Sequence, residues 1–282
     1  MTLRVLAHDD PEVEPLKEKI KRHIQQAEML GMPYWTFAVG PDPVGVVSVG
    51  TEPVMLFAPV GTQLSLIRVI DYGKPTEVLE EFASGAMALT KENEAEYSYM
   101  ILPAAQEKVE DIFKREGFQV LADTYRMTCD LASYEPSGGL RLERVEREEL
   151  ERFIDLAIEC MGESPDVILT MILKNLRGLP ENLLDLWYSL EEFFVVYDGE
   201  APVGILDLNV KEGVVSNVGV LPAHRGRGHG REIMLHGLRR LVEVGLEKAS
   251  LRVHVDNKVA IGLYKSLGFS AEDRIKHLIL WV

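Results

Sequence analysis

Two segments of the chain carry the same pattern 151 residues apart, and this repeat restricts the fold more than any other feature. They read "EDIFKREGFQVLADTYRM" (110–127) and "IGLYKSLGFSAEDRIKHL" (261–278), with "KREGF" of the first aligned on "KSLGF" of the second. Each segment predicts a helix that ends at a glycine and is followed by a strand. The strands "EYSYMIL" and "SLRVHV" precede the two helices. Helix–Gly–Phe–strand is common by itself, but the constant offset favours an internal duplication.

The repeat and the chain length together predict two domains. The 282 residues exceed the usual size of one domain. The stretch "ASYEPSGGL" (132–140), with one proline and two glycines, is the best candidate for a linker. We therefore expect one domain over residues 1–135 and a second over residues 136–282.

The second half alternates strands and helices in a readable order. We expect a strand at 140–146, an amphipathic helix at 147–162, and a helical region at 164–190 that is capped by Ser164 and interrupted at Gly178 and Pro180. A hairpin turning at Asp198-Gly199 follows. Next come a strand at 213–221, a helix at 231–245, and a last strand–helix–strand unit.

Charge and cysteine content exclude several classes of protein. The net charge is −15, and acidic residues outnumber basic ones in both halves, so we expect no nucleic-acid partner. An acidic surface favours cationic small molecules or basic peptides, or it serves solubility alone. Cys129 and Cys160 form no CxxC pair, so neither a disulfide framework nor a thiolate metal site is expected.

The ends and apolar stretches of the sequence indicate no export or membrane insertion. "MTLRVLAHDDPEVE" (1–14) lacks the charged and apolar regions of a secretory signal. The mostly apolar stretch 43–61 contains Glu52, prolines and glycines, which suit strands and turns better than a membrane helix. We expect a cytoplasmic protein with no membrane partner.

The stretch "HRGRGHGRE" (224–232) places three glycines and three arginines between a predicted strand and a predicted helix. Backbone N–H groups and a helix N-terminus face an anion together in this arrangement, so a phosphate or pyrophosphate is the expected ligand. Neither GxxxxGK[ST] nor G-x-G-x-x-G is present. His224, His229 and His236 match no zinc spacing, and no metal is expected.

The spacing R-x-x-G-x-G, formed by Arg225, Gly228 and Gly230 after "VSNVGVLPAH", resembles the pyrophosphate loop of the GNAT superfamily of acyl-CoA N-acyltransferases. "LRVHVDNKVAIGLYKSLGF" resembles the second motif of that family. The resemblance implies an α/β (α+β) fold, in which a mixed, mostly antiparallel sheet with a central parallel strand pair is flanked by helices. It also implies acetyl-CoA as co-substrate. The residues implied to bind it are Val218, Gly219, Val220, Arg225, Gly226, Arg227, Gly228, His229, Gly230, Arg231 and Asn257, the last of these through the pantetheine arm.

The first half departs from this motif. The region corresponding to the loop reads "DYGKPTEVLEEF" (71–82), where Pro75 removes a backbone donor and Glu77, Glu80 and Glu81 would repel a pyrophosphate. Gln106 and Phe113 stand where the second half has Asn257 and Tyr264. We therefore interpret residues 1–135 as a degenerate GNAT-like domain without a pyrophosphate loop, in a tandem arrangement.

The resemblance implies direct transfer of an acetyl group to a primary amine of a small molecule or peptide, with a cationic acceptor as one option. A backbone N–H around Val218 to Val220 would serve the oxyanion. Tyr264 would protonate the departing thiolate, or is a core aromatic. Val214 and Val215 occupy the region where many members carry a glutamate, so Glu212 or Asp207 acting through water is the expected base, with His254 as a further option. The alternative function is a non-catalytic acyl-CoA-binding sensor or assembly module.

Overall fold

The computed structural model describes residues 4–7, 11, 45–49, 52–60, 64–69, 72–92, 96–136, 138–178 and 181–282. Most of the N-terminal segment 1–14, parts of the stretch 43–61, and Asp71 and Pro180, for which expectations were stated, lie outside this part of the chain. Within it, no helix combines the length and the apolar character needed to cross a membrane.

The chain forms two compact units that do not divide at residue 135. One unit comprises Met1–Asp123 together with Asp273–Val282, and the other comprises Thr124–Glu272. Residues 124–135 therefore belong with the second half, and the last ten residues belong with the first. The cause lies in two long strands, β6 (Gln119–Asp130) and β12 (Ser270–Trp281), each of which has residues in both units.

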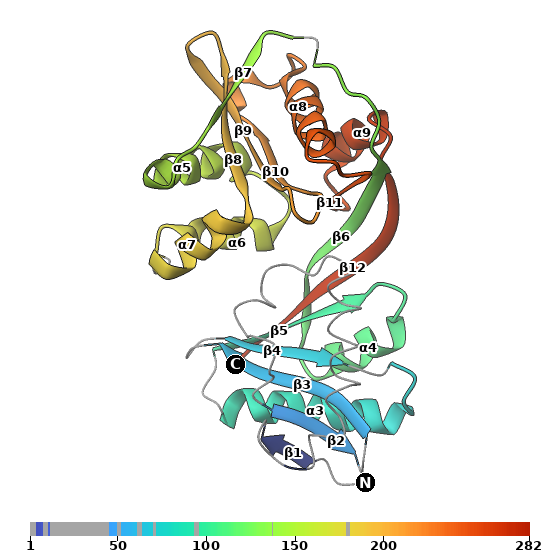
Figure 1. Ribbon diagram of the computed structural model, residues 1–282. Coiled ribbons are helices and arrows are strands. Elements are labelled where there is room, and N and C mark those ends of the chain that lie inside the picture. The colour runs from blue at the N-terminus through green and yellow to red at the C-terminus, as the bar shows by residue number, and fades with distance from the viewer. Residues whose placement is uncertain are drawn as a thin grey trace. The chain divides into compact units, whose positions relative to one another are not determined.

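The first unit contains strands in the order β1-β2-β3-β4-β5-β12, with β4 and β5 parallel. Helices α3 and α4 cover a core that includes Phe82, Met100, Phe113 and Leu278 (Figure 1). The bounds of its elements are β1 (Arg4–Ala7), β2 (Gly45–Val49), β3 (Glu52–Val60), β4 (Leu64–Val69), α3 (Thr76–Glu92), β5 (Tyr97–Pro103) and α4 (Glu107–Arg115).

The second unit contains strands in the order β6-β11-β10-β9-β8-β7, with β10 and β11 parallel. The mixed sheet flanked by helices that the sequence predicts is therefore present. The bounds are β7 (Leu140–Arg144), η2 (Arg147–Glu149), α5 (Leu150–Met161), α6 (Val167–Leu176), α7 (Glu181–Leu190), β8 (Glu192–Asp198), β9 (Ala201–Asn209), β10 (Val214–Val220), η3 (Pro222–His224), α8 (His229–Glu243), β11 (Lys248–His254) and α9 (Lys258–Ser266).

The expected hairpin is present, but Asp198 pairs with Ala201, so its two turn residues are Gly199 and Glu200 instead of Asp198 and Gly199, and one helix start was predicted incorrectly. β8 and β9 are joined by a two-residue turn in which Gly199 has φ 60°, as a tight hairpin requires. The helix expected to be capped by Ser164 begins instead at Val167. Its cap is Asp166, whose Oδ1 accepts the Leu169 N–H at 3.1 Å, while the Ser164 hydroxyl accepts the Asp166 N–H at 3.2 Å.

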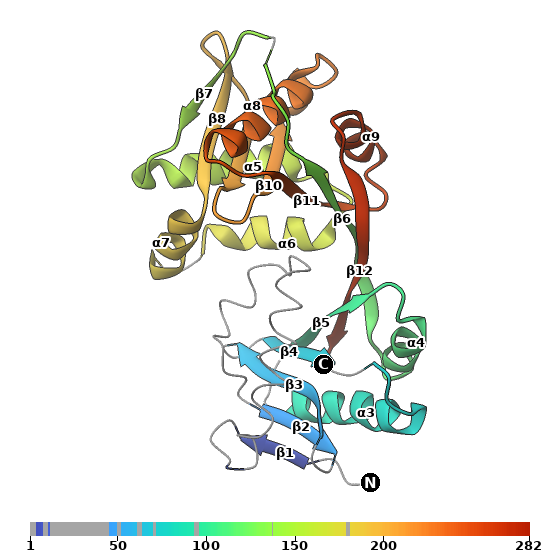
Figure 2. The ribbon, with the colours of Figure 1, turned by 45° about the vertical axis from the view of Figure 1, so that its right-hand side comes forward.

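Different helices cover the two faces of the sheet in the second unit (Figures 1 and 2). Successive side chains of a strand point to opposite faces. Ile205 packs with residues of α5, α6 and α7, whereas Leu206 packs with residues of α8. We call these the α5–α7 face and the α8 face.

Three consecutive elements recur with the offset that the sequence repeat shows. Adding 151 to the bounds of β5, α4 and β6 gives the bounds of β11, α9 and β12. The helix ends also match. Gly117 and Gly268 have φ 98° and 94°, and the next residue, Phe118 or Phe269, donates its N–H across the turn to the Phe113 or Tyr264 carbonyl.

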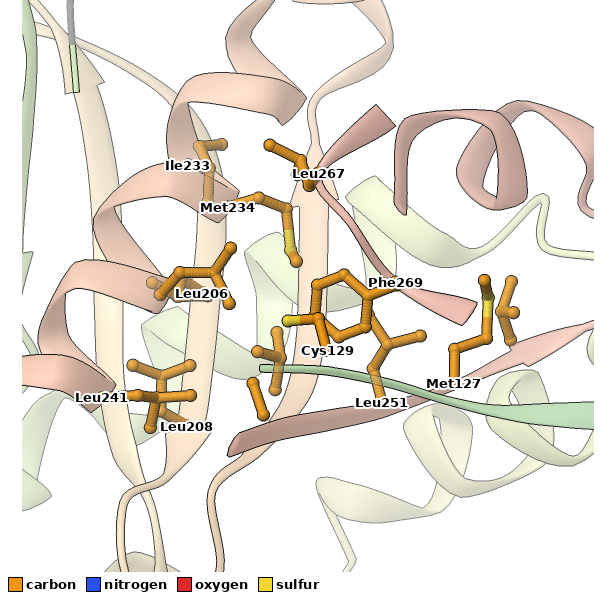
Figure 3. Close-up of a cluster of buried hydrophobic side chains, with 14 of the residues drawn as sticks. Met127, Cys129, Leu206, Leu208, Ile233, Met234, Leu241, Leu251, Leu267 and Phe269 are labelled. Atoms are coloured by element: carbon orange, nitrogen blue, oxygen red, sulfur yellow. The ribbon is translucent and has the colours of Figure 1, made fainter. Parts of the chain in front are cut away.

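The last strand of each repeat pairs with the other repeat. β12 is antiparallel to β5, with Trp281 opposite Tyr97, and β6 is antiparallel to β11, with Asp130 opposite Lys248. Both pairings have the same register. Figure 3 shows the consequence for packing: Met127 and Cys129 of β6 lie in one cluster with Leu251 and Phe269.

Candidate functional site

The parallel strands β10 and β11 meet at one point only. Val214 is opposite Ser250, and the Ser250 N–H donates to the Gly213 carbonyl at 2.8 Å. From Val215 onward β10 has no partner on this side in the described pairing. The corresponding strands β4 and β5 of the first unit pair at four successive positions, from Leu64 opposite Tyr97 to Ile67 opposite Met100. β4 and β5 continue to Val69 and Pro103, so they also separate before their ends. Met100 corresponds to Leu251 in the repeat, so their pairing stops one repeat position later than that of β10 with β11.

Backbone groups of β10 face the side from which β11 has separated. The Leu221 N–H donates to the Val203 carbonyl of β9 at 2.9 Å, and bonded pairs alternate along an antiparallel ladder. Gly219, opposite Ile205, therefore bonds to β9, whereas Val218 and Val220 direct their N–H and C=O groups away from it. Of the expected oxyanion donors, Val218 and Val220 are suitably placed, and the Gly219 N–H is used within the sheet.

The glycine loop that follows β10 has room for a ligand at its backbone. Gly226 and Gly228 have φ 77° and 88°, and a Cβ built on either would meet no atom within 4 Å. The Gly228 carbonyl accepts the N–H groups of Arg231 and Glu232. The N–H groups before Arg231 have no carbonyl within their own helix, so they can donate to an anion at the start of α8. The loop therefore has the space and the helix N-terminus that suit an anionic group.

The three arginines of the loop hold it in place through protein contacts. Arg225 donates to the carbonyls of Val220 at 3.3 Å and Cys160 at 3.0 Å, and to Glu163 Oε2 at 3.0 Å. Arg227 donates to the Ala223 carbonyl at 3.3 Å, and Arg231 donates to Ser266 Oγ at 2.7 Å. The Arg225 guanidinium thus secures the end of β10 to α5, and the Arg225 backbone N–H donates to the Pro222 carbonyl at 3.3 Å.

The histidines of the loop region pack without forming a metal site. The rings of His224 and His229 have centroids 6.3 Å apart, and His229 Nε2 lies 4.0 Å from Asp198 Oδ2. Among the described residues no group of three or more metal-ligating side chains comes together.

Two residues of the second predicted motif lie on α9. Asn257 is its N-cap: Oδ1 accepts the Ala260 N–H at 3.1 Å, which leaves the Nδ2 group for a ligand. Tyr264 packs against Phe269, with ring centroids 6.0 Å apart. Burial raises the pKa of Tyr264 to about 12, so its phenol is protonated at neutral pH.

A pair of buried carboxyl groups lies on the α5–α7 face beside the bulge of β10. The register of β10 against β9 shifts between Val215 and Asn217, so Ser216 is the extra residue. Ser216 Oγ donates to Glu191, at 3.0 Å from each carboxylate oxygen, and Asn217 Nδ2 donates to Asp207 Oδ2 at 2.8 Å. Glu191 and Asp207 are 5% and 0% exposed.

Sequence reasoning named Asp207 and missed Glu191. Glu191 and Glu192 follow the helical region expected at 164–190, and the sequence analysis assigned no role to either of them. The alternation of side chains along a strand could have identified Glu191. It lies on the same side as Phe193, Val195 and Tyr197, all of which pack on the α5–α7 face. Burial raises the pKa of both carboxyls, and the charge of Asp207 raises that of Glu191 further.

The other two expected bases lie apart from this pair. Glu212 is exposed in the turn between β9 and β10, where its N–H donates to Asn209 Oδ1 at 2.9 Å. This turn adjoins the end of β10 that pairs with β11, whereas the glycine loop follows its other end. His254 ends β11, and its Nδ1 accepts the Asp256 N–H at 3.2 Å.

Parallel strands that separate over a glycine loop and a helix N-terminus define an α/β protein with a binding site for a phosphate-bearing ligand. Residues 168–269 match the model of the Acetyltransferase (GNAT) family, and this part of the chain is a GNAT acetyltransferase domain. A mycothiol acetyltransferase of Streptomyces scabiei is 37% identical over 97 residues, which cover 33% of this chain and 32% of the relative. Other relatives with that name are matched over 18% to 58% of their length.

Solved structures match the fold over nearly the whole chain. A GCN5-related N-acetyltransferase from Sphaerobacter thermophilus has a TM-score of 0.66 at 15% identity, with 99% of this chain and 95% of that chain covered. A tandem GNAT protein from the clavulanic acid biosynthesis pathway has a TM-score of 0.59 at 13% identity, with 99% and 98% covered. At sequence identities of 15% and 13%, the structural similarity establishes the fold alone.

Proposed function

We propose that the protein is an acetyl-CoA-dependent N-acetyltransferase that transfers an acetyl group directly to a primary amine of a small molecule or peptide. The observation that carries the proposal is the separation of β10 from β11 beyond Val214, which leads to the open glycine loop at the start of α8. The family match over residues 168–269 supports it. The cytoplasmic location expected from the sequence stays part of the proposal.

Acetyl-CoA supplies an activated thioester when bound. Backbone N–H groups of the glycine loop and of β10, together with the Asn257 side chain, would hold it. The backbone N–H groups of the loop from Gly226 to Gly230 would bind the pyrophosphate, whereas the Arg225 N–H donates to the Pro222 carbonyl. Asn257 Nδ2 would hydrogen-bond the pantetheine arm. The N–H groups of Val218 and Val220 would donate to the acyl carbonyl oxygen, where they stabilise developing negative charge.

The chain also offers groups that move protons. The acceptor amine must be uncharged to attack, and a free alkylammonium has a pKa of roughly 10. Asp207 is the sequence-predicted base that lies beside β10, and Glu212 lies in the exposed turn. Tyr264, whose phenol stays protonated, would donate to the departing thiolate.

The acceptor is proposed from the relatives. They are named mycothiol acetyltransferases, so a mycothiol-related amine is the first candidate. Buried carboxyl groups on the α5–α7 face suit an acceptor that arrives as an ammonium ion. Thiol release from acetyl-CoA, measured across amino sugars, cysteinyl amides, polyamines and a lysine peptide, tests this proposal. Binding of acetyl-CoA without turnover on any amine would favour the alternative, a non-catalytic sensor or assembly module, which the valines at 214 and 215 motivate.

We also propose that the first half, near residues 1–135, is a degenerate copy of the second, near 136–282. The shared offset of β5, α4 and β6 with β11, α9 and β12 supports the duplication. Phe113, which replaces Tyr264, is fully buried.

Replacing Tyr264 by phenylalanine is expected to lower kcat by roughly 10–100-fold, because the thiolate then leaves without a proton donor. The KM for acetyl-CoA should stay within about 2-fold, since the ring keeps its contact with Phe269. Steady-state thiol release with the best amine measures both. Tyr134→Phe, a change at another partly buried tyrosine of the same cluster, is the control and should leave kcat unchanged. An unchanged kcat in Tyr264→Phe would make Tyr264 a packing residue.

A further inference from the structure

We propose that Asn217 binds the nitrogen of the acceptor and selects primary amines: its Oδ1 accepts a hydrogen bond from an acceptor N–H, while Asp207 fixes the orientation of the Asn217 amide. This inference rests on the proposed function and deepens it. It concerns where the acceptor nitrogen is held and assigns no proton transfer. Asn217 would touch the acceptor, whereas Asp207, which is fully buried, is a positioning residue that acts through Asn217.

The first step is that Asp207 sets the orientation of the Asn217 amide. The two residues lie directly opposite each other on β9 and β10, and Asn217 Nδ2 donates to Asp207 Oδ2 at 2.8 Å. Burial raises the pKa of Asp207, and the side-chain and backbone N–H groups of Asn217 oppose this effect by favouring the ionised form. An ionised carboxylate only accepts hydrogen bonds, so the amide nitrogen faces Asp207 and the amide oxygen faces away from it.

The second step is that the Asn217 amide oxygen is available to a ligand. Asn217 is only partly buried. Among the described residues no N–H or O–H group donates to its Oδ1, yet this oxygen is not one of the buried atoms that lack a hydrogen-bond partner. It is therefore open to solvent. An amide oxygen has two lone pairs and accepts N–H groups of both an ammonium ion and an uncharged amine.

The third step is that Asn217 lies beside the proposed position of the thioester. It immediately precedes Val218, whose N–H would donate to the acyl oxygen. Val218 packs on the α8 face, so Asn217 and Gly219 point to the α5–α7 face. A Cβ built on Gly219 would lie 2.5 Å from Cys160 Cβ, so the end of α5 covers that position. Asn217, roughly 7 Å earlier along the strand, is the partly exposed position of this face from which an amine can approach the acyl carbon.

The number of hydrogens on the nitrogen explains why this contact favours a primary amine. A primary ammonium ion, R–NH3+, loses one proton and attacks the acyl carbon with its electron pair. The C–S bond of the thioester then breaks and the nitrogen loses a second proton, so that one proton ends on the thiol and the other in solvent. The product amide, R–NH–CO–CH3, still has one N–H for Asn217 Oδ1. An uncharged secondary amine has one N–H and gives it up as the amide forms, so the contact is lost.

Asn217→Leu, which keeps roughly the size of the side chain, tests the inference by steady-state thiol release at pH 8. We expect the KM for a primary alkylamine to rise by roughly 10–50-fold with kcat within about 3-fold, because the hydrogen bond is made both before and during attack. The preference for the primary amine over its N-methyl derivative, compared as kcat/KM, should fall by roughly 3–10-fold. The affinity for acetyl-CoA, measured by isothermal titration, should stay within about 2-fold.

The matched control is Asn209→Leu, the same change at an asparagine on the same face of the neighbouring strand. Asn209 Oδ1 accepts the N–H groups of Lys211 at 3.2 Å and Glu212 at 2.9 Å, so it is committed to the turn after β9. This variant should lower Tm, because the two N–H groups lose their acceptor. Its KM for the primary amine and its preference over the N-methyl derivative should both stay within about 2-fold of wild type.

Asp207→Asn tests the positioning role while Asn217 is kept. The new amide both donates and accepts, so it fixes neither orientation of the Asn217 amide, and the KM for the primary amine should rise by roughly 3–10-fold. Burial raises the pKa of Asp207 from 3.8 to about 7, so its ionisation destabilises the folded protein above that range. The variant removes this effect, and its Tm at pH 8 should not fall below that of wild type. An unchanged KM would overturn the positioning role, and a higher KM with undiminished Tm excludes a folding defect.

The two proposals fail in distinguishable ways. Wild type that releases no thiol with any amine overturns the proposed function, and this inference with it. Wild-type turnover together with an unchanged KM and an unchanged amine preference in Asn217→Leu leaves the enzyme assignment in place and overturns this inference alone. Equal losses with the primary amine and its N-methyl derivative, accompanied by lost acetyl-CoA affinity, would make Asn217 a residue of the fold and would likewise overturn the inference.

Discussion

Replacing Met127 by aspartate is expected to abolish coenzyme A binding, although Met127 precedes the predicted linker. Met127 is fully buried on β6 and packs in the α8-face cluster with Leu251 and Phe269 (Figure 3). A carboxylate placed there without a partner destabilises the second unit by roughly 4 kcal/mol or more. Hydrogen exchange should show lost protection in β11, and the thermal shift caused by acetyl-CoA should disappear.

Leu278→Asp is the matched variant, because Leu278 is the repeat-equivalent of Met127 and is also fully buried. It lies on β12, but it packs with Phe82 and Phe113 of the first unit. We expect lost protection in β5 and retained acetyl-CoA binding. The opposite result, with β5 opened by the change at 127 and β11 opened by the change at 278, would contradict the strand pairing.

The sequence could predict the local structure of this chain because the signals there are chemical and short-range. Gly199, Gly228 and Gly268 all have positive φ at a predicted turn, loop or helix end. The strand order in which each repeat donates its last strand to the other could not be predicted. The segments 119–130 and 270–281 follow equivalent helices and carry similar patterns, so either one suits either neighbour.

The part of the candidate site that depends on backbone conformation, the glycine loop, could be predicted from the sequence. The part that depends on which side chains are buried, the carboxyl groups, could not. The glycine loop follows from spacing alone. Whether Glu191, Asp207 or Glu212 lies near the open side of β10 depends on which strand faces which helix, and a sequence does not state this. Glu212 is close to β10 along the chain but lies in an exposed turn, whereas Glu191 is distant along the chain and accepts a hydrogen bond from the Ser216 hydroxyl of β10.

Gly228→Glu is expected to lower coenzyme A affinity by at least about 100-fold, roughly 2.7 kcal/mol, measured by isothermal titration. Gly228 is the N-cap of α8 with φ 88°, so the new side chain sits where backbone N–H groups would meet the pyrophosphate. Its negative charge would repel the diphosphate and compete for the same donors. The fold should persist, because no atom lies within 4 Å of the built Cβ and an acidic side chain at a helix N-terminus is favourable.

Gly245→Glu separates the effect on the ligand from the effect of backbone strain. Gly245 follows the other end of α8, has φ 86°, and likewise has no atom within 4 Å of a built Cβ. Both variants therefore place the same side chain in the same left-handed conformation, at a cost of roughly 1–2 kcal/mol. Gly245→Glu should destabilise α8 more than Gly228→Glu does, because a negative charge at the C-terminus of a helix opposes the helix dipole. Near-wild-type affinity in Gly245→Glu with lost affinity in Gly228→Glu would place the diphosphate at the N-terminal loop, whereas equal affinity in the two variants would move the coenzyme site elsewhere.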